Sequence, residues 1–131
     1  MSNKLDKILA EISAGELIDK ITILEIKKDK IADQTKQTEI DKELDSLNAT
    51  MNDSIKDKSK ISILRDQLKD LNLKLWDIEN EKRLSEKKND FGPKFIELAR
   101  NVYKFNDERA KIKLKINQTL GSNIKEVKSH F

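Results

Sequence analysis

The main feature of the sequence is a regular alternation of apolar and polar positions with the period of an α-helix. Apolar residues recur three and four positions apart, which places them on one face of a helix. Four amphipathic segments follow from this pattern, over residues 14–33, 38–56, 59–87 and 93–120. Segment 14–33 is rich in β-branched residues, which leaves a strand as the minority alternative there. The sequence therefore predicts an all-α fold in one domain over residues 1–131.

Local signals support these helix limits. Ser13-Ala14-Gly15-Glu16 has the pattern of a capping box, in which a serine caps the helix and a glutamate follows three residues later. Gln34 to Thr38 is polar and is predicted to connect the first two helices. Gly92-Pro93 favours a helix start, because proline suits the first helical position. Gly121 stands where a C-terminal glycine cap belongs.

The third segment carries an apolar seam whose spacings alternate between three and four, as in a coiled coil. The seam consists of Ile61, Leu64, Leu68, Leu71, Leu75 and Ile78. The third and fourth helices would each be about 42 Å long at about 1.5 Å per residue. Their matched lengths and short joint predict a long antiparallel hairpin, with the two shorter helices packed on it as a bundle.

A shorter pattern precedes the first helix. Residues 3–12 carry Leu5, Ile8, Leu9 and Ile12 at the spacing of a helix stripe. An extended course that buries the same four side chains is the open alternative.

Composition adds an expectation of self-association. Charged residues make up 39% of the chain and hydrophobic ones 36%, so the core is thin and a second copy is expected to complete it. Ile63, Leu73 and Leu84 lie outside the third-helix seam and are candidates for a homodimer contact. A protein partner is the other open possibility.

Charge and hydropathy argue against other partners. The net charge is +3, and no run of five like charges occurs, so a nucleic-acid partner is not expected. No segment approaches the roughly 20 apolar residues of a membrane span. We therefore expect no membrane contact and a cytoplasmic location.

The chain offers few residues for metal or hydrolytic chemistry. It has no cysteine, and its one histidine is His130. Cysteine metal sites, histidine metal sites and hydrolytic triads are therefore not expected. Glycine-rich phosphate loops are also absent. We expect no metal and no cofactor.

Polar residues within or beside the apolar stripes form the candidate polar network or ligand site. They are Glu16, Asp19, Lys20, Glu97, Arg100, Tyr103, Asn106, Asp107 and Arg109. Arg109 falls within the stripe of the fourth helix, so its guanidinium must reach solvent or meet a carboxylate. Asp19 and Glu16 are the preferred partners, and Asp77 or Glu79 are the alternatives.

Three roles compete for these residues. A structural network that fixes helix register is favoured, a ligand or partner pocket comes next, and catalysis is least favoured. The competing hypothesis is a small ligand-binding or enzymatic domain that holds an anionic sugar-nucleotide-like molecule through Lys20, Arg100 and Arg109. Trp76 is predicted to anchor a core or an interface. We therefore predict a non-enzymatic helical binding or assembly module.

Several segments carry a family resemblance. They are Ser13 to Lys27 (SAGELIDKITILEIK), Leu71-Asn72 with 75–79 (LWDIE), 95–100 (FIELAR) with Val102-Tyr103, Asn106-Asp107 with Arg109-Ala110, and the close from Gly121 to Ser129. Together they resemble an uncharacterised bacterial and phage family of small helical proteins of unknown function. The resemblance implies an association with glycosyltransferase or cell-surface polysaccharide systems. It implies no known activity.

Overall fold

The computed structural model describes residues 4–128, so His130 lies outside the described part. In chain order its elements are α1 (Ala14–Lys30), α2 (Gln34–Ser54), the 3-10 helix η1 (Lys58–Ile61), α3 (Ser62–Lys87) and α4 (Pro93–Leu120). The described residues contain no strand, which confirms the predicted all-α fold. Within this part of the chain, no helix is both long enough and apolar enough to cross a membrane.

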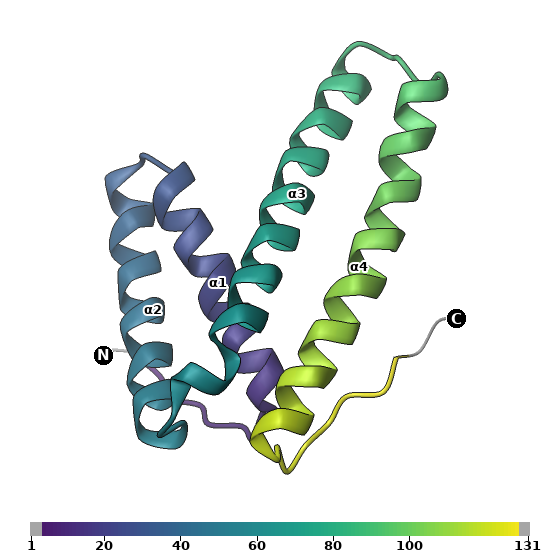
Figure 1. Cartoon of the computed structure of the whole chain (residues 1–131). Coiled ribbons are helices and arrows are strands. Elements are labelled where there is room, and N and C mark those ends of the chain that lie inside the picture. The colour runs from purple at the N-terminus through teal and green to yellow at the C-terminus, as the bar shows by residue number, and fades with distance from the viewer. Residues whose placement is uncertain (1–3, 129–131) are drawn as a thin grey trace.

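The helices form two hairpins that diverge from a common base (Figure 1). The shorter hairpin consists of α1 and α2, and the longer one consists of the predicted antiparallel pair α3 and α4. α1 is the central element because it packs against α2, α3 and α4, whereas α2 packs against α1 alone among the α-helices. The long hairpin therefore carries α1 directly and α2 only through α1.

The apolar core lies where α1 crosses the base of the long hairpin. Its completely buried members come from three helices and are Ile18, Ile21, Leu68 and Ile116. α2 contributes buried Ile40, Leu44 and Met51 to the same cluster. These residues occupy the predicted stripes, so the burial of apolar area explains why the four helices form.

The predicted helix limits agree with the structure to within a few residues. The largest difference is at α2, which begins at Gln34 because the side chain of Asp33 accepts a hydrogen bond from the Lys36 amide at 2.9 Å. The predicted connection from Gln34 to Thr38 is therefore helical, and this prediction was wrong. Pro93 begins α4 as expected, and Gly121 ends it with a left-handed φ of 65°.

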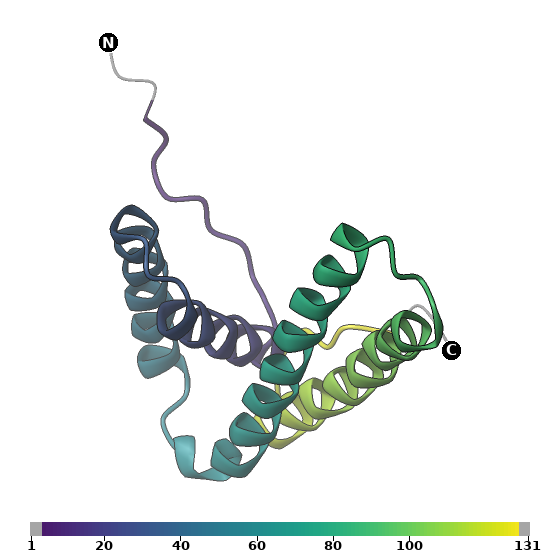
Figure 2. The same ribbon diagram turned by 90° about the horizontal axis from the view of Figure 1, so that it is seen from above.

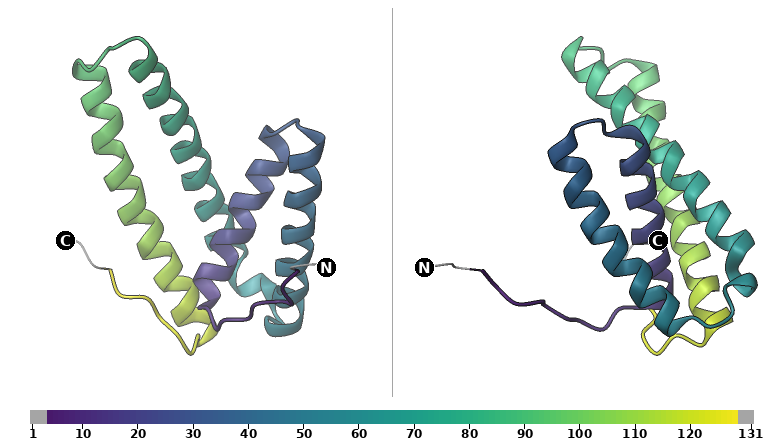
Figure 3. Two further views of the ribbon diagram at one scale, coloured as in Figure 1. Left: turned by 180° about the vertical axis from the view of Figure 1, so that it is seen from behind. Right: turned by 90° about the vertical axis from the view of Figure 1, so that its left-hand side faces the viewer.

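Residues 4–12 form an extended arm that contradicts both expectations for this segment. Figures 2 and 3 show the arm leading away from the two hairpins. Leu5, Ile8 and Leu9 are 76, 82 and 88% exposed, so the arm is neither helical nor buried. A helix of nine residues is marginal without a surface to pack on, which explains why the helical pattern alone was insufficient.

Candidate functional site

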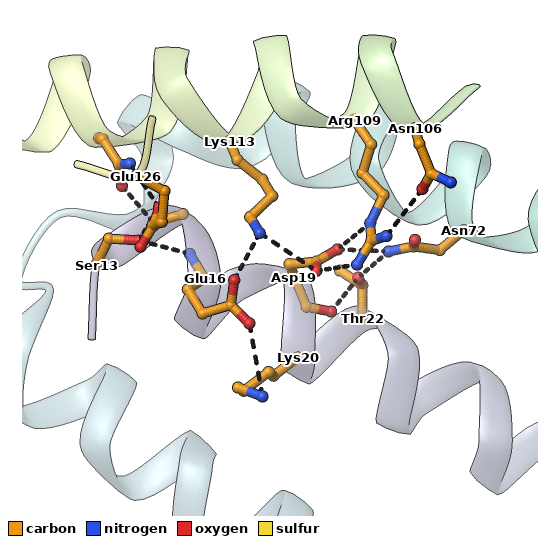
Figure 4. A network of polar contacts seen from close by, with 12 residues as sticks. Ser13, Glu16, Asp19, Lys20, Thr22, Asn72, Asn106, Arg109, Lys113 and Glu126 are labelled. Carbon is orange, nitrogen blue, oxygen red and sulfur yellow. Dashed lines mark hydrogen bonds and ion pairs between the residues drawn. The ribbon is translucent and has the colours of Figure 1, made fainter. Parts of the chain in front are cut away.

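A row of polar side chains joins α1 to α4 (Figure 4). We call it the polar seam. α1 with its N-cap contributes residues at every third position, and α4 contributes residues three and four positions apart, which lie on one helix face. The members are Ser13, Glu16, Asp19 and Thr22 from the first set, and Asn106, Arg109, Lys113 and Asn117 from the second. α3 adds Asn72, and the segment after α4 adds Ser122 and Glu126.

Asp19 is the most buried charge of the seam, with 1% of its side chain exposed. Arg109 donates to both of its oxygens, through Nε at 3.0 Å and through Nη2. Asn72 donates to it from Nδ2 at 2.9 Å, and the Lys113 ammonium lies 3.8 Å away. The predicted Arg109–Asp19 pair is therefore present, and both carboxylate oxygens of Asp19 are occupied.

Arg109 closes the seam at its far end. Its Nη1 donates to Asn106 Oδ1 at 3.1 Å. The hydrogen bonds to Asp19 raise the pKa of the guanidinium, whereas its burial acts in the opposite direction. The guanidinium is thus a fixed cation that neutralises a buried carboxylate.

Glu16 pairs with two lysines and not with Arg109, for which it was a preferred partner. Its carboxylate pairs with Lys113 at 2.5 Å and with Lys20 at 3.5 Å. Ser13 Oγ accepts a hydrogen bond from the Glu16 amide at 3.0 Å, so the serine part of the predicted capping box is present. The glutamate instead ties α1 to α4.

Side chains occupy the first three amide groups of α1. Ala14 N donates to Ser122 Oγ at 3.0 Å, and Gly15 N donates to Asn117 Oδ1 at 2.6 Å. With the Glu16 amide bound to Ser13, these N–H groups, which a helix leaves unpaired at its start, all have partners. This helix end is therefore not free to bind an anion.

Gly15 allows α1 to approach α4 this closely. A Cβ atom at this position would lie 2.5 Å from the backbone oxygen of Lys113, well inside van der Waals contact. A glycine is therefore required by the contact between two helix backbones.

Glu126 extends the seam beyond α4. Ser13 Oγ donates to Glu126 Oε1 at 2.7 Å, and Asn117 Nδ2 donates to the same oxygen at 3.4 Å. Burial raises the carboxyl pKa, but these hydrogen bonds outweigh it and leave the pKa of Glu126 below its usual value. The ionised carboxylate thereby holds residues 121–126 against the start of α1.

The remaining predicted site residues lie outside this cluster. Glu97, Arg100 and Tyr103 are exposed on the far half of α4, and the structure gives them no hydrogen bond or ion pair within residues 4–128. Arg100 is nine residues from Arg109, about 13.5 Å along the helix. Asp107 pairs instead with Lys128 at 2.9 Å.

Sequence reasoning missed several members of the seam. They are Ser13 as a partner of the tail, Thr22, Asn72, Lys113, Asn117, Ser122 and Glu126. One signal was available for α4, because Lys113 and Asn117 follow Arg109 at steps of four and so share its helix face.

An open groove of about 440 Å³ lies beside the seam, between α1 and α3. We call it the α1–α3 groove. Its floor and walls are mostly apolar, and polar side chains stand at its rim. The main lining residues are Ile23, Ile26, Leu75, Trp76, Glu79 and Arg83, and Arg109 reaches it from α4. Trp76 is half-buried there, as suits the predicted anchor residue.

Neither the seam nor the groove gathers metal ligands. Across residues 4–128, no group of three or more acidic or histidine side chains is arranged to hold a metal ion.

The comparisons with known proteins identify the family of the chain. The family of unknown function DUF6165 matches residues 8–131, which includes α1 to α4 and the complete polar seam. The searches found no matching curated protein and no matching solved structure. The expected membership of a family without a known function is confirmed. The chain belongs to the DUF6165 family of unknown function.

Proposed function

We propose that the protein is a non-enzymatic binding and assembly module that acts in the cytoplasm and forms a homodimer. The proposal rests on the observation that the polar groups of the seam already have partners within the protein. Asp19, the most buried charge of the seam, already accepts hydrogen bonds from Arg109 and Asn72. A buried carboxylate whose two oxygens already have donors belongs to a satisfied network, and such networks rigidify a fold.

The geometry does not favour the competing hypothesis of a site for an anionic molecule. The three cations of that hypothesis lie in different environments and do not converge. Lys20 pairs with Glu16, Arg109 is held by Asp19, and Arg100 lies on another part of α4. A phosphate-binding site needs cations that converge on one point.

Exposed apolar surface supports a binding role. The α1–α3 groove leaves Trp76 half-exposed, and Ile63 and Leu84 of α3 are 73 and 53% exposed. A groove with an apolar lining offers a surface for contact with another protein. Two of these three residues belong to the set predicted to form a homodimer contact.

Sedimentation velocity tests the proposal. At micromolar concentration the protein should sediment as a dimer of its 15.2 kDa chain. Its single tryptophan, Trp76, gives a second readout, because its emission should shift to shorter wavelength as the concentration rises. A monomer at every concentration up to about 100 micromolar, far above a typical specific affinity, would contradict the homodimer. The association with glycosyltransferase systems stays a prediction.

A further inference from the structure

The arm at residues 4–12 carries four exposed apolar side chains. They are Leu5, Ile8, Leu9 and Ile12. In an extended chain, successive side chains alternate between two faces, so these four residues are divided. In a helix they lie on one face. The arm therefore has a sequence suited to a helix that packs on another surface.

A helical arm has charges in suitable places. At about 100° per residue, Asp6 lies beside the apolar face of the arm, and Lys7 lies on the opposite side. Asp6 has no ion pair in the described structure. The arm therefore presents an apolar face with Asp6 at one edge and Lys4 at the other.

The α1–α3 groove is complementary to such a helix. Ile23, Ile26, Leu75 and Trp76 supply an apolar surface. Arg83 stands at the rim, is exposed, and has no acidic partner among residues 4–128. An amphipathic helix in an apolar groove is a common mode of recognition, and Arg83 offers the cation that Asp6 would need.

The arm of the same chain cannot fill this groove as a helix. Its base is fixed, because Ser13 is buried and Glu11 Oε2 accepts a hydrogen bond from Asn123 Nδ2 at 2.7 Å. A helix from Leu5 to Ile12 spans about 10.5 Å, whereas Ile23 lies about 15 Å along α1 from Ser13. The arm also leads away from its own hairpins (Figure 2). The groove that it can enter belongs to another molecule.

We propose that the arm of one chain folds as a helix in the α1–α3 groove of a second copy, and that two copies exchange arms. The proposal rests on the homodimer proposed above and names its contact. Exchange of two identical arms gives a closed, two-fold symmetric dimer, which is the commonest form of protein self-association.

Surface substitutions test the arm. The variant Ile8→Lys/Leu9→Lys changes two exposed side chains, so its circular dichroism and melting should equal those of the wild type at concentrations where both are monomeric. We expect its dimer dissociation constant to rise at least about 100-fold, because each dimer buries both arms. The emission of Trp76 should lose its dependence on concentration. Ile96→Lys changes another exposed apolar side chain, on α4 and outside the lining of the α1–α3 groove, so this matched control should remain a dimer.

Mixing an arm variant with a groove variant distinguishes arm exchange from other modes of dimerisation. A groove variant, Trp76→Ala/Arg83→Glu, retains an intact arm, and the arm variant retains an intact groove. Each alone should be monomeric, and an equimolar mixture should form heterodimers through one remaining arm-groove contact. Arg83→Glu alone should weaken the dimer, and Asp6→Lys should restore it in the same chain.

The outcomes distinguish this inference from the broader proposal. A dimer that survives the arm substitutions but is lost on Ile63→Lys would overturn arm exchange and retain the homodimer. Failure of the mixture to associate would also overturn the exchange. A wild-type protein that is monomeric throughout would overturn both.

Discussion

Replacement of Arg109 by alanine tests whether the polar seam is structural. The substitution removes both hydrogen bonds to Asp19, whose side chain is only 1% exposed. A hydrogen bond to a charged group contributes about 1.5–3 kcal/mol, so the gross loss is about 3–6 kcal/mol. Lys113, whose ammonium lies 3.8 Å from Asp19, can approach and recover part of this loss. We expect a net cost of about 3–5 kcal/mol, as for other buried pairs that lose one partner.

Urea unfolding followed by circular dichroism measures this cost. An unfolding entropy of about 2.1 cal/mol/K per residue converts it into a decrease in Tm of roughly 11–18 °C. Arg100→Ala is the matched control on the same helix. Arg100 is exposed and has no partner in the described residues, so its loss should change stability by less than about 0.5 kcal/mol.

A second substitution identifies the cause. In Arg109→Ala, the cost comes from an uncompensated buried carboxylate. Adding Asp19→Asn removes that charge and keeps an oxygen for Asn72 to donate to. The double variant should therefore be more stable than Arg109→Ala alone. A cost below about 1 kcal/mol for Arg109→Ala, or a double variant less stable than the single one, would refute the structural interpretation.

Two further predictions concern the same region, and a third concerns metal binding. Gly15→Ala should cost about 1–3 kcal/mol in urea unfolding, because its Cβ would meet the Lys113 backbone, and a gain in stability would contradict this. The pKa of Glu126 is lowered in the folded protein, so its ionised carboxylate stabilises the tail contact at pH values above the usual glutamate pKa of about 4.3. This stabilisation is lost as the pH falls through the lowered pKa. After correction for intrinsic rates, hydrogen exchange of the Ala14 amide should therefore become faster at low pH in the wild type. In Glu126→Gln the corrected rate should not depend on pH. Thermal melts with and without a chelator should coincide, and any difference would indicate a metal.

Local patterns predicted the helices and one buried pair. The stripe spacings placed α1, α3 and α4 to within a few residues. Arg109 was predictable because a guanidinium within an apolar stripe must reach solvent or meet a carboxylate, and Asp19 was one of its two preferred partners, with Glu16. In both cases the signal is the position of a residue relative to a helix stripe.

Contacts made by segments without a helical stripe could not be predicted in this way. Ser13 and Glu126 are 113 residues apart, and the segment around Glu126 has no periodicity that would point to α1. The prediction for the arm was wrong for the opposite reason. Its helical period is clear, but nine residues do not form a stable helix unless a surface binds them. A helical period shows which residues share a helix face, but it does not show which surface packs against that face.

The three capping contacts of α1 also bear on the order in which the chain folds during synthesis. Ala14, Gly15 and Ser13 obtain their partners from Ser122, Asn117 and Glu126, which are 108, 102 and 113 residues further along the chain. At about 5–20 residues per second, a ribosome reaches those partners roughly 6–23 s after it has made the start of α1. Until then the start of α1 has only its local cap from Ser13, the Ala14 and Gly15 amides lack their partners, and the face of α1 that packs against α4 is uncovered.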